Sequence, residues 1–128
     1  MADPPAVKDS ILQSTKKMLG IGHDDDSFDL DITIHINTAF STMFQAGVGP
    51  ILGFQIDDEN NVWSQFTGDR MDIAGVKTYV YLRVRLLFDP PTSSFALDAV
   101  QKQIDELLWR LNVAADFTIV PLENLEIP

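Results

Sequence analysis

The sequence predicts a mainly α-helical protein, a small four-helix bundle with a long connection between its second and third helices and an extended C-terminal tail. Apolar residues recur at three- and four-residue intervals in four segments, which is the pattern of amphipathic helices. A short turn with two prolines separates the last two segments, so we expect these helices to pair as an antiparallel hairpin. The 128 residues suit a single domain, which buries roughly two-thirds of its unfolded surface.

The first predicted helix begins at Asp9 or Ser10 and ends at Leu19. Either of the first two side chains can cap free amide groups, and Gly20 and Gly22 follow the last apolar residue. One face of this helix contains Ile11, Leu12, Thr15, Met18 and Leu19. We expect this face to pack on the core.

The second predicted helix begins at Phe28, after four residues of N-cap type, and ends before Gly47. From Leu30 to Ile36, apolar and polar residues alternate, as they would in a strand. We favour the helix because apolar residues also recur at four-residue intervals over about five turns, whereas the alternation covers only the first half. The recurring residues are Phe28, Ile32, Ile36, Phe40 and Phe44.

A polar connection, residues 51–69, follows the second helix and is longer than a typical link between elements. Two local structures fit its sequence. One is a short hairpin around Asp57–Asn61, and the other is a single helical turn from Val62 to Phe66 that Asn61 would cap. We favour the helical turn.

The third predicted helix, from Ile73 to Phe88, is apolar on two sides. One side contains Ile73, Val76, Val80, Val84, Leu87 and Phe88, and the other contains Tyr79, Leu82 and Leu86. A helix with two apolar faces needs two neighbours. Pro90 and Pro91 end this helix, because proline lacks an amide proton and restricts the residue before it.

The fourth predicted helix begins at Ser93 or Ser94, either of which can cap it, and ends near Asn112. Its inward face contains Leu97, Val100, Ile104, Leu107, Leu108 and Leu111. Beyond this helix, apolar and polar residues alternate between prolines, so we expect an extended tail. The predicted division is a helical domain of residues 1–113 and a tail of residues 114–128.

The composition limits the classes of function. The net charge is −10, and no Lys or Arg occurs between Lys17 and Arg70, where nine acidic residues lie. Because DNA affinity depends on clustered basic residues, we expect no strong DNA binding. The absence of cysteine excludes disulfides and thiolate metal sites. No apolar run approaches the roughly 20 residues of a bilayer span, and the N-terminus has no basic or apolar signal segment, so we expect neither a membrane protein nor an exported one.

No recognised catalytic or cofactor-binding motif occurs in the sequence. His23 and His35 do not stand in a recognised metal-ligand spacing. The polar run from Asp57 resembles a calcium loop, but Val62 occupies the position of its glycine and Gly68 that of its bidentate glutamate. We therefore expect a protein that is not an enzyme and that has no catalytic residue, cofactor or bound metal.

Six residues are candidates for a subunit or partner interface: Trp63, Arg83, Arg85, Trp109, Phe117 and Ile119. The two arginines interrupt the apolar third helix, and they would either bind a partner's carboxylate or extend to solvent. Trp109 lies off the inward face of the fourth helix, and tryptophan is enriched at interfaces. The alternative for both tryptophans is a place in the core of the single chain.

Two segments, residues 76–95 (VKTYVYLRVRLLFDPPTSSF) and 104–113 (IDELLWRLNV), resemble head-to-tail connector proteins of tailed bacteriophages. Residues 11–50 resemble the same family, with an acidic loop, the run His35-Ile36-Asn37 and a closing Gly-Val-Gly-Pro. The resemblance covers residues 10–113. It depends on the combined pattern, since none of these motifs is catalytic.

The resemblance implies a helical bundle that assembles as a dodecameric ring beneath the portal at the capsid vertex and adapts the portal to the tail. The expected partners are other copies of the chain, the portal protein and a downstream neck or tail protein, while genomic DNA passes without specific binding. The expected location is the neck of the virion, and the host cytoplasm during assembly. Two alternatives remain: another neck or tail component, such as a stopper or tail terminator, and a small helical regulatory protein.

Overall fold

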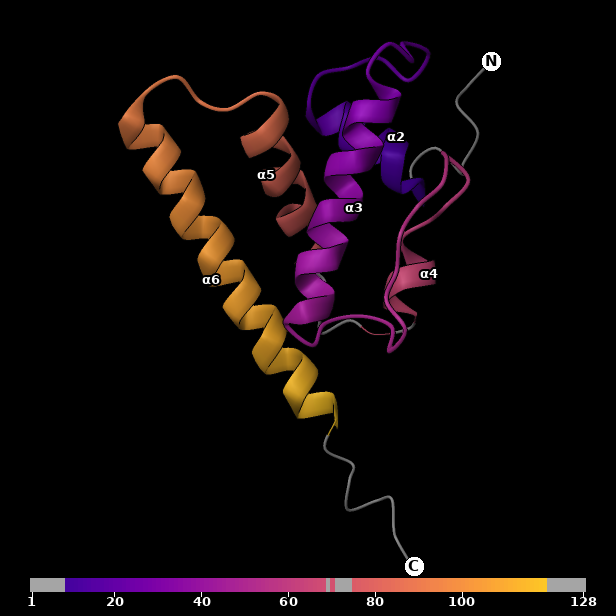
Figure 1. Ribbon diagram of the computed structural model, residues 1–128, viewed down its shortest axis with the longest axis vertical. Helices are drawn as coiled ribbons and strands as arrows, with labels where there is room; N and C mark the ends of the chain where they lie inside the picture. The colour runs from indigo at the N-terminus through magenta and orange to yellow at the C-terminus, as the bar shows by residue number, and fades with distance from the viewer. Residues whose placement is uncertain (1–8, 69, 71–74, 120–128) are drawn as a thin grey trace, which may run out of the picture.

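The computed structural model describes residues 9–68, 70 and 75–119, with the backbone alone for residues 116–119 (Figure 1). Its helices are α2 (Ile11–Met18), α3 (Asp29–Gln45), α4 (Ser64–Thr67), α5 (Val76–Phe88) and α6 (Ser94–Ile119). No strand occurs in these ranges, where one isolated antiparallel bridge joins Ser10 to Val62. The predicted mainly α-helical class is confirmed, with four main helices and a long connection before α5.

Helix α5 packs against three other helices, α3, α6 and α2. Its buried residues belong to both predicted faces: Val76, Val80 and Val84 to one, and Tyr79 and Leu82 to the other. The prediction that this helix needs two neighbours is confirmed. One residue of the first face differs from the prediction, because Leu87 is exposed in the last turn of α5. Ile73 lies outside the described residues.

Helix α6 returns antiparallel to α5 after the turn at residues 89–93, as predicted (Figure 1). Ser93 caps this helix, because its Oγ accepts a hydrogen bond from the N–H of Ala96 at 3.1 Å. Of the predicted inward face, Ile104 and Leu111 are buried, Val100, Leu107 and Leu108 are partly buried, and Leu97 is exposed. Figure 1 shows α6 diverging from α3 toward the N-terminal end of α6, while near its other end Asn112 Nδ2 donates to the carbonyl of Ala46.

The end of α6 differs from the prediction. The helix continues through Ile119, past the predicted end at Asn112, so the boundary at residue 113 lies inside a helix. The prediction of an extended chain is therefore wrong for residues 114–119, and residues 120–128 lie outside the described part. Ala114 and Ala115 explain the difference, because alanine has the highest helix propensity and Ala115 is also buried.

Helix α3 is helical over its whole length, so the strand alternative is wrong. In the middle of its four-residue stripe, Ile32, Ile36 and Phe40 are buried. The two ends of the stripe, Phe28 and Phe44, are exposed instead. A four-residue step advances by about 40° around a helix, so the two ends of the stripe lie about 80° to either side of its buried middle residue, Ile36, and face away from the core.

Four aromatic rings fix the connection between α3 and α5 to the core. Phe40, on α3, lies 5.0 Å from Phe54 and 4.8 Å from Phe66 between ring centroids, and Trp63 packs on the same ring at 6.3 Å. Gly49 passes close to this cluster with φ of +107°, and a Cβ there would lie 2.6 Å from the ring of Phe66. Only glycine fits this position.

The connection contains the predicted helical turn, which begins two residues later than expected, at Ser64. The alternative hairpin around residues 57–61 does not form. Asn61 does not cap α4, because its Oδ1 accepts a hydrogen bond from the N–H of Asp57 at 2.8 Å and so closes the preceding loop. Trp63 occupies the cap position, and its side chain makes no capping hydrogen bond.

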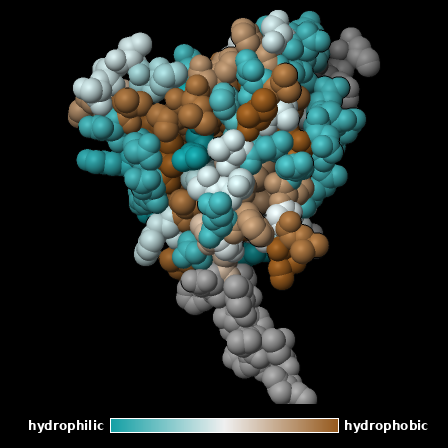
Figure 2. Space-filling model, viewed as in Figure 1, coloured by the Kyte–Doolittle hydropathy of each residue, from teal (hydrophilic) through white to brown (hydrophobic). Residues whose placement is uncertain are grey.

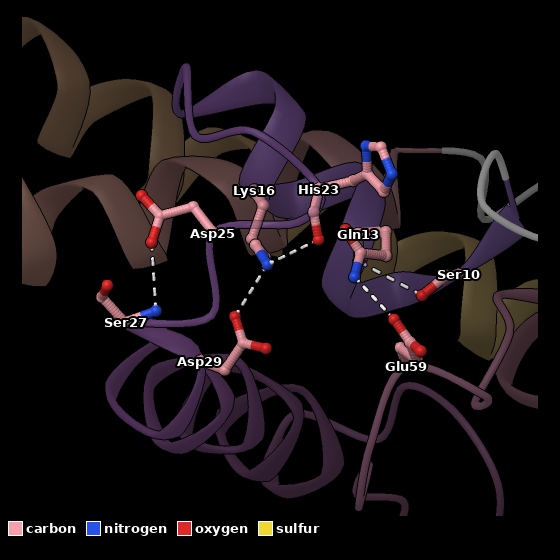
Figure 3. Close-up of polar contacts among 8 residues, drawn as sticks. All are labelled: Ser10, Gln13, Lys16, His23, Asp25, Ser27, Asp29 and Glu59. Atoms are coloured by element: carbon pink, nitrogen blue, oxygen red, sulfur yellow. Dashed lines mark hydrogen bonds and ion pairs between the residues drawn. The ribbon is translucent and has the colours of Figure 1, made fainter. Parts of the chain in front are cut away.

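A buried ion pair joins α2 to α3 (Figure 3). Lys16 Nζ lies 2.8 Å from Asp29 Oδ1 and donates a hydrogen bond to the carbonyl of His23 at 3.3 Å. The side chain of Lys16 is 0% exposed, whereas that of Asp29 is 31% exposed. The ammonium group therefore depends on this carboxylate for its charge balance, while the carboxylate still reaches water.

Helix α5 buries a phenol group that has no hydrogen-bond partner among the described residues. Tyr79 is fully buried, and its hydroxyl neither donates nor accepts there. Burial raises the pKa of Tyr79 above its ordinary value near 10, the charge of Arg83 opposes this shift, and the charge of Asp105 adds to it. Tyr79 is therefore held in its neutral form.

The ion pair predicts unequal effects of removing its two partners. Asp29→Ala leaves a fully buried ammonium group without its carboxylate, and we expect it to lower the free energy of unfolding by about 3 kcal/mol. Lys16→Met leaves a carboxylate that can hydrate, and we expect a loss of less than about 1 kcal/mol. Urea unfolding followed by circular dichroism measures both. Asp31→Ala, in the same exposed first turn of α3, controls for the helix dipole. Equal losses for the two partners would contradict this account of the pair.

The unpartnered phenol predicts that Tyr79→Phe stabilises the protein. The substitution removes a polar group that is buried without a hydrogen bond, so we expect the free energy of unfolding to rise by about 1 kcal/mol at neutral pH. Because folding raises the pKa of Tyr79, ionisation of this phenol lowers the free energy of unfolding of the wild type as the pH rises from 10 through the folded value. The advantage of the variant should therefore widen above about pH 10. Thermal unfolding at several pH values, with Tyr81→Phe as the control, measures it, and a destabilised variant would refute the prediction.

Candidate interaction surfaces

An acidic cleft of about 480 Å³ opens between α2, the start of α3 and the connection. Its walls carry six carboxylates, two from the loop after α2, one from α3 and three from the connection. These are Asp24, Asp26, Asp29, Asp57, Asp58 and Glu59. Residues far apart in the sequence therefore place negative charge around one hollow.

Hydrogen bonds fix the side of the cleft that the connection forms. Gln13 Nε2 donates to Glu59 Oε1 at 2.7 Å, and Figure 3 shows this amide and carboxylate facing each other. Asn61 Oδ1 accepts from the N–H of Asp57 at 2.8 Å and from that of Asp58 at 3.4 Å. The carboxylates of this side are thus attached to a backbone of fixed conformation.

The loop on the other side of the cleft is ordered by Asp25, which does not line the hollow. Its Oδ1 accepts a hydrogen bond from the N–H of Ser27 at 3.1 Å (Figure 3). Hydrogen bonds from the side chain and the backbone of Ser27 lower the pKa of Asp25. This local turn holds the two lining residues on either side of Asp25, Asp24 and Asp26.

The acidic side chains and the two histidines are the groups that could hold a metal ion. Within the described ranges, no group of three or more His, Asp or Glu side chains is placed to hold a metal ion. In the run that resembles a calcium loop, Asn61 directs its oxygen to backbone amides and not toward the neighbouring carboxylates. His23 is exposed in the loop after α2, and His35 is half-buried on α3.

Among the described helices, none is both long and apolar enough to cross a bilayer.

Of the six predicted interface residues, Trp63 lies in the core. Its ring packs on Phe40, its Nε1 donates to Ser14 Oγ at 2.9 Å, and Lys77 Nζ lies 5.8 Å from the ring centroid. In the single chain, Trp63 therefore has the core position that the sequence left open as the alternative. The indole joins α2 to the connection.

Arg83 and Arg85 lie half-buried on α5. Arg83 Nη2 has a long hydrogen bond of 3.4 Å to Thr42 Oγ1 on α3. The Nε of Arg85 is buried and has no hydrogen-bond partner among the described residues. Neither guanidinium group has a carboxylate partner in that part of the chain. Both groups therefore keep hydrogen-bond donors for a further partner.

Trp109 is 66% exposed on the outer side of α6, away from the buried Ile104 and Leu111. Phe95, at the start of α6, and Leu87, at the end of α5, are also exposed. Figure 2 shows hydrophobic side chains gathered over the upper part of the α5–α6 side of the molecule. We use the name hairpin surface for the exposed apolar residues of α5 and α6, which are Leu87, Phe95, Leu97 and Trp109, together with the two half-buried arginines of α5; these residues are distributed around the two helices. The side chains of Phe117 and Ile119 lie outside the described part, although both residues belong to α6.

A second exposed apolar group was not predicted. Ile51 and Leu52 are 89% and 93% exposed at the tip of a tight turn, which the hydrogen bond from Gly53 N–H to the carbonyl of Pro50 closes at 2.9 Å. Buried Val48 holds one end of this turn in the core. Figure 2 shows hydrophobic side chains at the lower right, over the connection that follows α3. Two adjacent aliphatic residues directly after Gly-Pro were the signal in the sequence.

Comparison with protein families places the chain among known proteins. Residues 11–118 match the family described as phage connector protein. The match continues past residue 113, where the sequence resemblance ended, and so includes most of α6. No curated protein and no solved structure matches the chain.

Proposed function

This chain belongs to the phage connector protein family, and we propose that its copies assemble as a dodecameric ring that joins the portal to the tail in the neck of the virion. Membership of the family implies a structural head-to-tail connector, not an enzyme. The observation that carries the finer proposal is the hairpin surface. It leaves large apolar side chains exposed, and its two arginines have no carboxylate partner among the described residues.

The hairpin surface has the composition of a subunit interface. Trp and Arg are the residues most enriched among those that dominate binding energy, and here they lie on adjacent helices. The aliphatic stripe of α6 is only partly covered by α5, so a neighbouring copy would bury the remainder. The guanidinium group of Arg85, which has no carboxylate partner among the described residues, would then gain one from the neighbour. Helices α5 and α6 thus form the wall between subunits.

The acidic charge suits a protein beside a DNA channel. Nine acidic residues and no basic residue occur between Lys17 and Arg70, and the acidic cleft gathers six of them. A surface of this sign repels phosphates and lets duplex DNA pass without binding. The partners in this proposal are the portal protein on one side and a downstream neck or tail protein on the other.

The helical architecture supports a connector over a stopper or tail terminator, since those families are rich in strands and the described ranges are built from helices. A small helical regulator remains the other candidate. It differs from a connector in a measurable way, because it would stay a monomer or dimer at every concentration.

The ring predicts that Trp109→Ala weakens assembly. Trp109 is mostly exposed in the single chain, so its loss leaves the monomer folded, whereas a buried interface tryptophan contributes about 2 kcal/mol or more. We expect the concentration needed for assembly to rise by about tenfold or more, measured by sedimentation velocity with and without the portal protein. Gln103→Ala, at another exposed position of α6, is the control and should assemble normally. Normal assembly of Trp109→Ala would remove this residue from the interface, and a wild-type protein that stays monomeric with portal present would refute the ring.

The channel role predicts very weak binding to DNA. The wild-type protein should bind a duplex of about 30 base pairs with a Kd weaker than about 100 μM at physiological salt, because few phosphates can be neutralised. Fluorescence anisotropy of a labelled duplex measures this affinity. Micromolar binding would contradict a channel through which DNA slides, and it would leave the ring proposal untouched.

A further inference from the structure

We propose that the acidic cleft binds an arginine side chain from a basic segment of a partner protein. The juxtaposition that carries this inference is the set of carboxylates around the cleft together with the buried amide of Gln13 in its wall. The inference does not depend on the ring, because the cleft is formed within one chain.

The charges that face the cleft are not balanced inside the described structure. Six carboxylates line it, with His23 at its edge, and the ammonium group of Lys16 is engaged by Asp29 and by a backbone carbonyl. The other five carboxylates have no ion-pair partner among the described residues. A hollow with walls of one charge concentrates the electric field and attracts the opposite charge. A cationic ligand would therefore gain attraction from several carboxylates at once.

Gln13 provides an independent indication of a ligand. It is 5% exposed and lines the cleft, and its Nε2 is bound to Glu59, whereas its Oε1 has no donor within the described residues. A buried amide oxygen without a donor is unfavourable, and native structures rarely keep one unless a ligand or water satisfies it. The missing partner is a hydrogen-bond donor, which is what a cationic side chain carries.

The arrangement of the acceptors favours a guanidinium group over a metal ion. The carboxylates are distributed over three segments around the hollow, and in the described ranges no three of them are placed to hold one ion. Arginine instead presents five N–H donors in a flat fork, which can reach several separate acceptors. The volume of about 480 Å³ admits one or two extended side chains but not a folded element.

Several acceptors are held in place before any ligand arrives. Asn61 fixes the backbone that carries Asp57 and Asp58, Gln13 holds Glu59, and Lys16 holds Asp29. Figure 3 shows Gln13, Lys16, Asp29 and Glu59 converging from α2, α3 and the connection. A ligand would then lose little affinity to the ordering of these groups, as in other preorganised sites.

The experiment measures binding of a short labelled peptide with three arginines spaced by glycines to the full chain, by fluorescence anisotropy at low ionic strength. The test variant is Asp57→Asn with Asp58→Asn and Glu59→Gln, and we expect its Kd to rise by about tenfold or more. The matched control, Asp89→Asn with Asp98→Asn and Glu106→Gln, removes the same charge from exposed positions outside the cleft. Its Kd should rise by less than about threefold, because screened charges at a distance contribute little.

Further measurements distinguish an arginine site from diffuse attraction, from a general site for cationic side chains and from a metal site. Amide NMR spectra should show that the arginine peptide shifts the side-chain amide of Gln13 and the backbone amides of residues 57–59. Equal losses of affinity in the test and control variants would show diffuse attraction and overturn the proposal. Equal affinity for the corresponding lysine peptide would overturn the choice of arginine, and displacement of the peptide by millimolar calcium would identify a metal site instead. Absence of binding by the wild-type chain would also refute the proposal, while the ring would still be tested by sedimentation.

Discussion

The need to cover both apolar faces of α5 determines the arrangement of the other helices. Val76, Val80 and Val84 on one side and Tyr79 on the other are almost fully removed from water, and burial of each such side chain contributes about 1.5–3 kcal/mol. No single neighbour can reach both faces, so α3 and α2 pack against this helix together with α6. The Pro-Pro turn makes this possible by returning α6 antiparallel after five residues, at 89–93.

The same constraint leaves α6 incompletely covered. Helix α5 has 13 residues and α6 has 26, so one partner of half the length cannot bury the whole apolar stripe of α6. Leu111 is buried near Gly75, just before the start of α5, whereas Leu97 is exposed toward the N-terminal end of α6, where this helix diverges from the others, and Trp109 is exposed on the outer side of α6. An exposed apolar surface, beside arginines that have no carboxylate partner among the described residues, is typical of a subunit that is completed by a neighbour. The incomplete covering of α6 therefore links the fold to the proposed assembly.

Periodicity and capping were sufficient to predict the four main helices, their order and the α5–α6 hairpin, because these features depend on local sequence. They were insufficient where position depends on which neighbour is within reach. Phe28 and Phe44 fit the stripe of α3 and are nevertheless exposed, and the sequence left both an interface and a core position open for Trp63, which lies in the core of the single chain. The acidic cleft could not be predicted, because its carboxylates come from segments about thirty residues apart. Capping of the second helix already accounted for the acidic run before Phe28. Gln13 belongs to no motif, and only the fold places its amide beside Glu59.

The negative charge of this protein can serve two functions that differ in range. Repulsion of DNA phosphates depends on the summed charge of the surface, and it acts over a screening length of about 8 Å at physiological salt. Binding of an arginine depends instead on fixed acceptors at hydrogen-bond distance, such as the carboxylate that Gln13 holds. Rising salt weakens both effects but leaves the directional contacts of a partly buried site less affected than the long-range field. The same carboxylates can therefore keep duplex DNA from adhering and still hold a basic side chain of a protein partner.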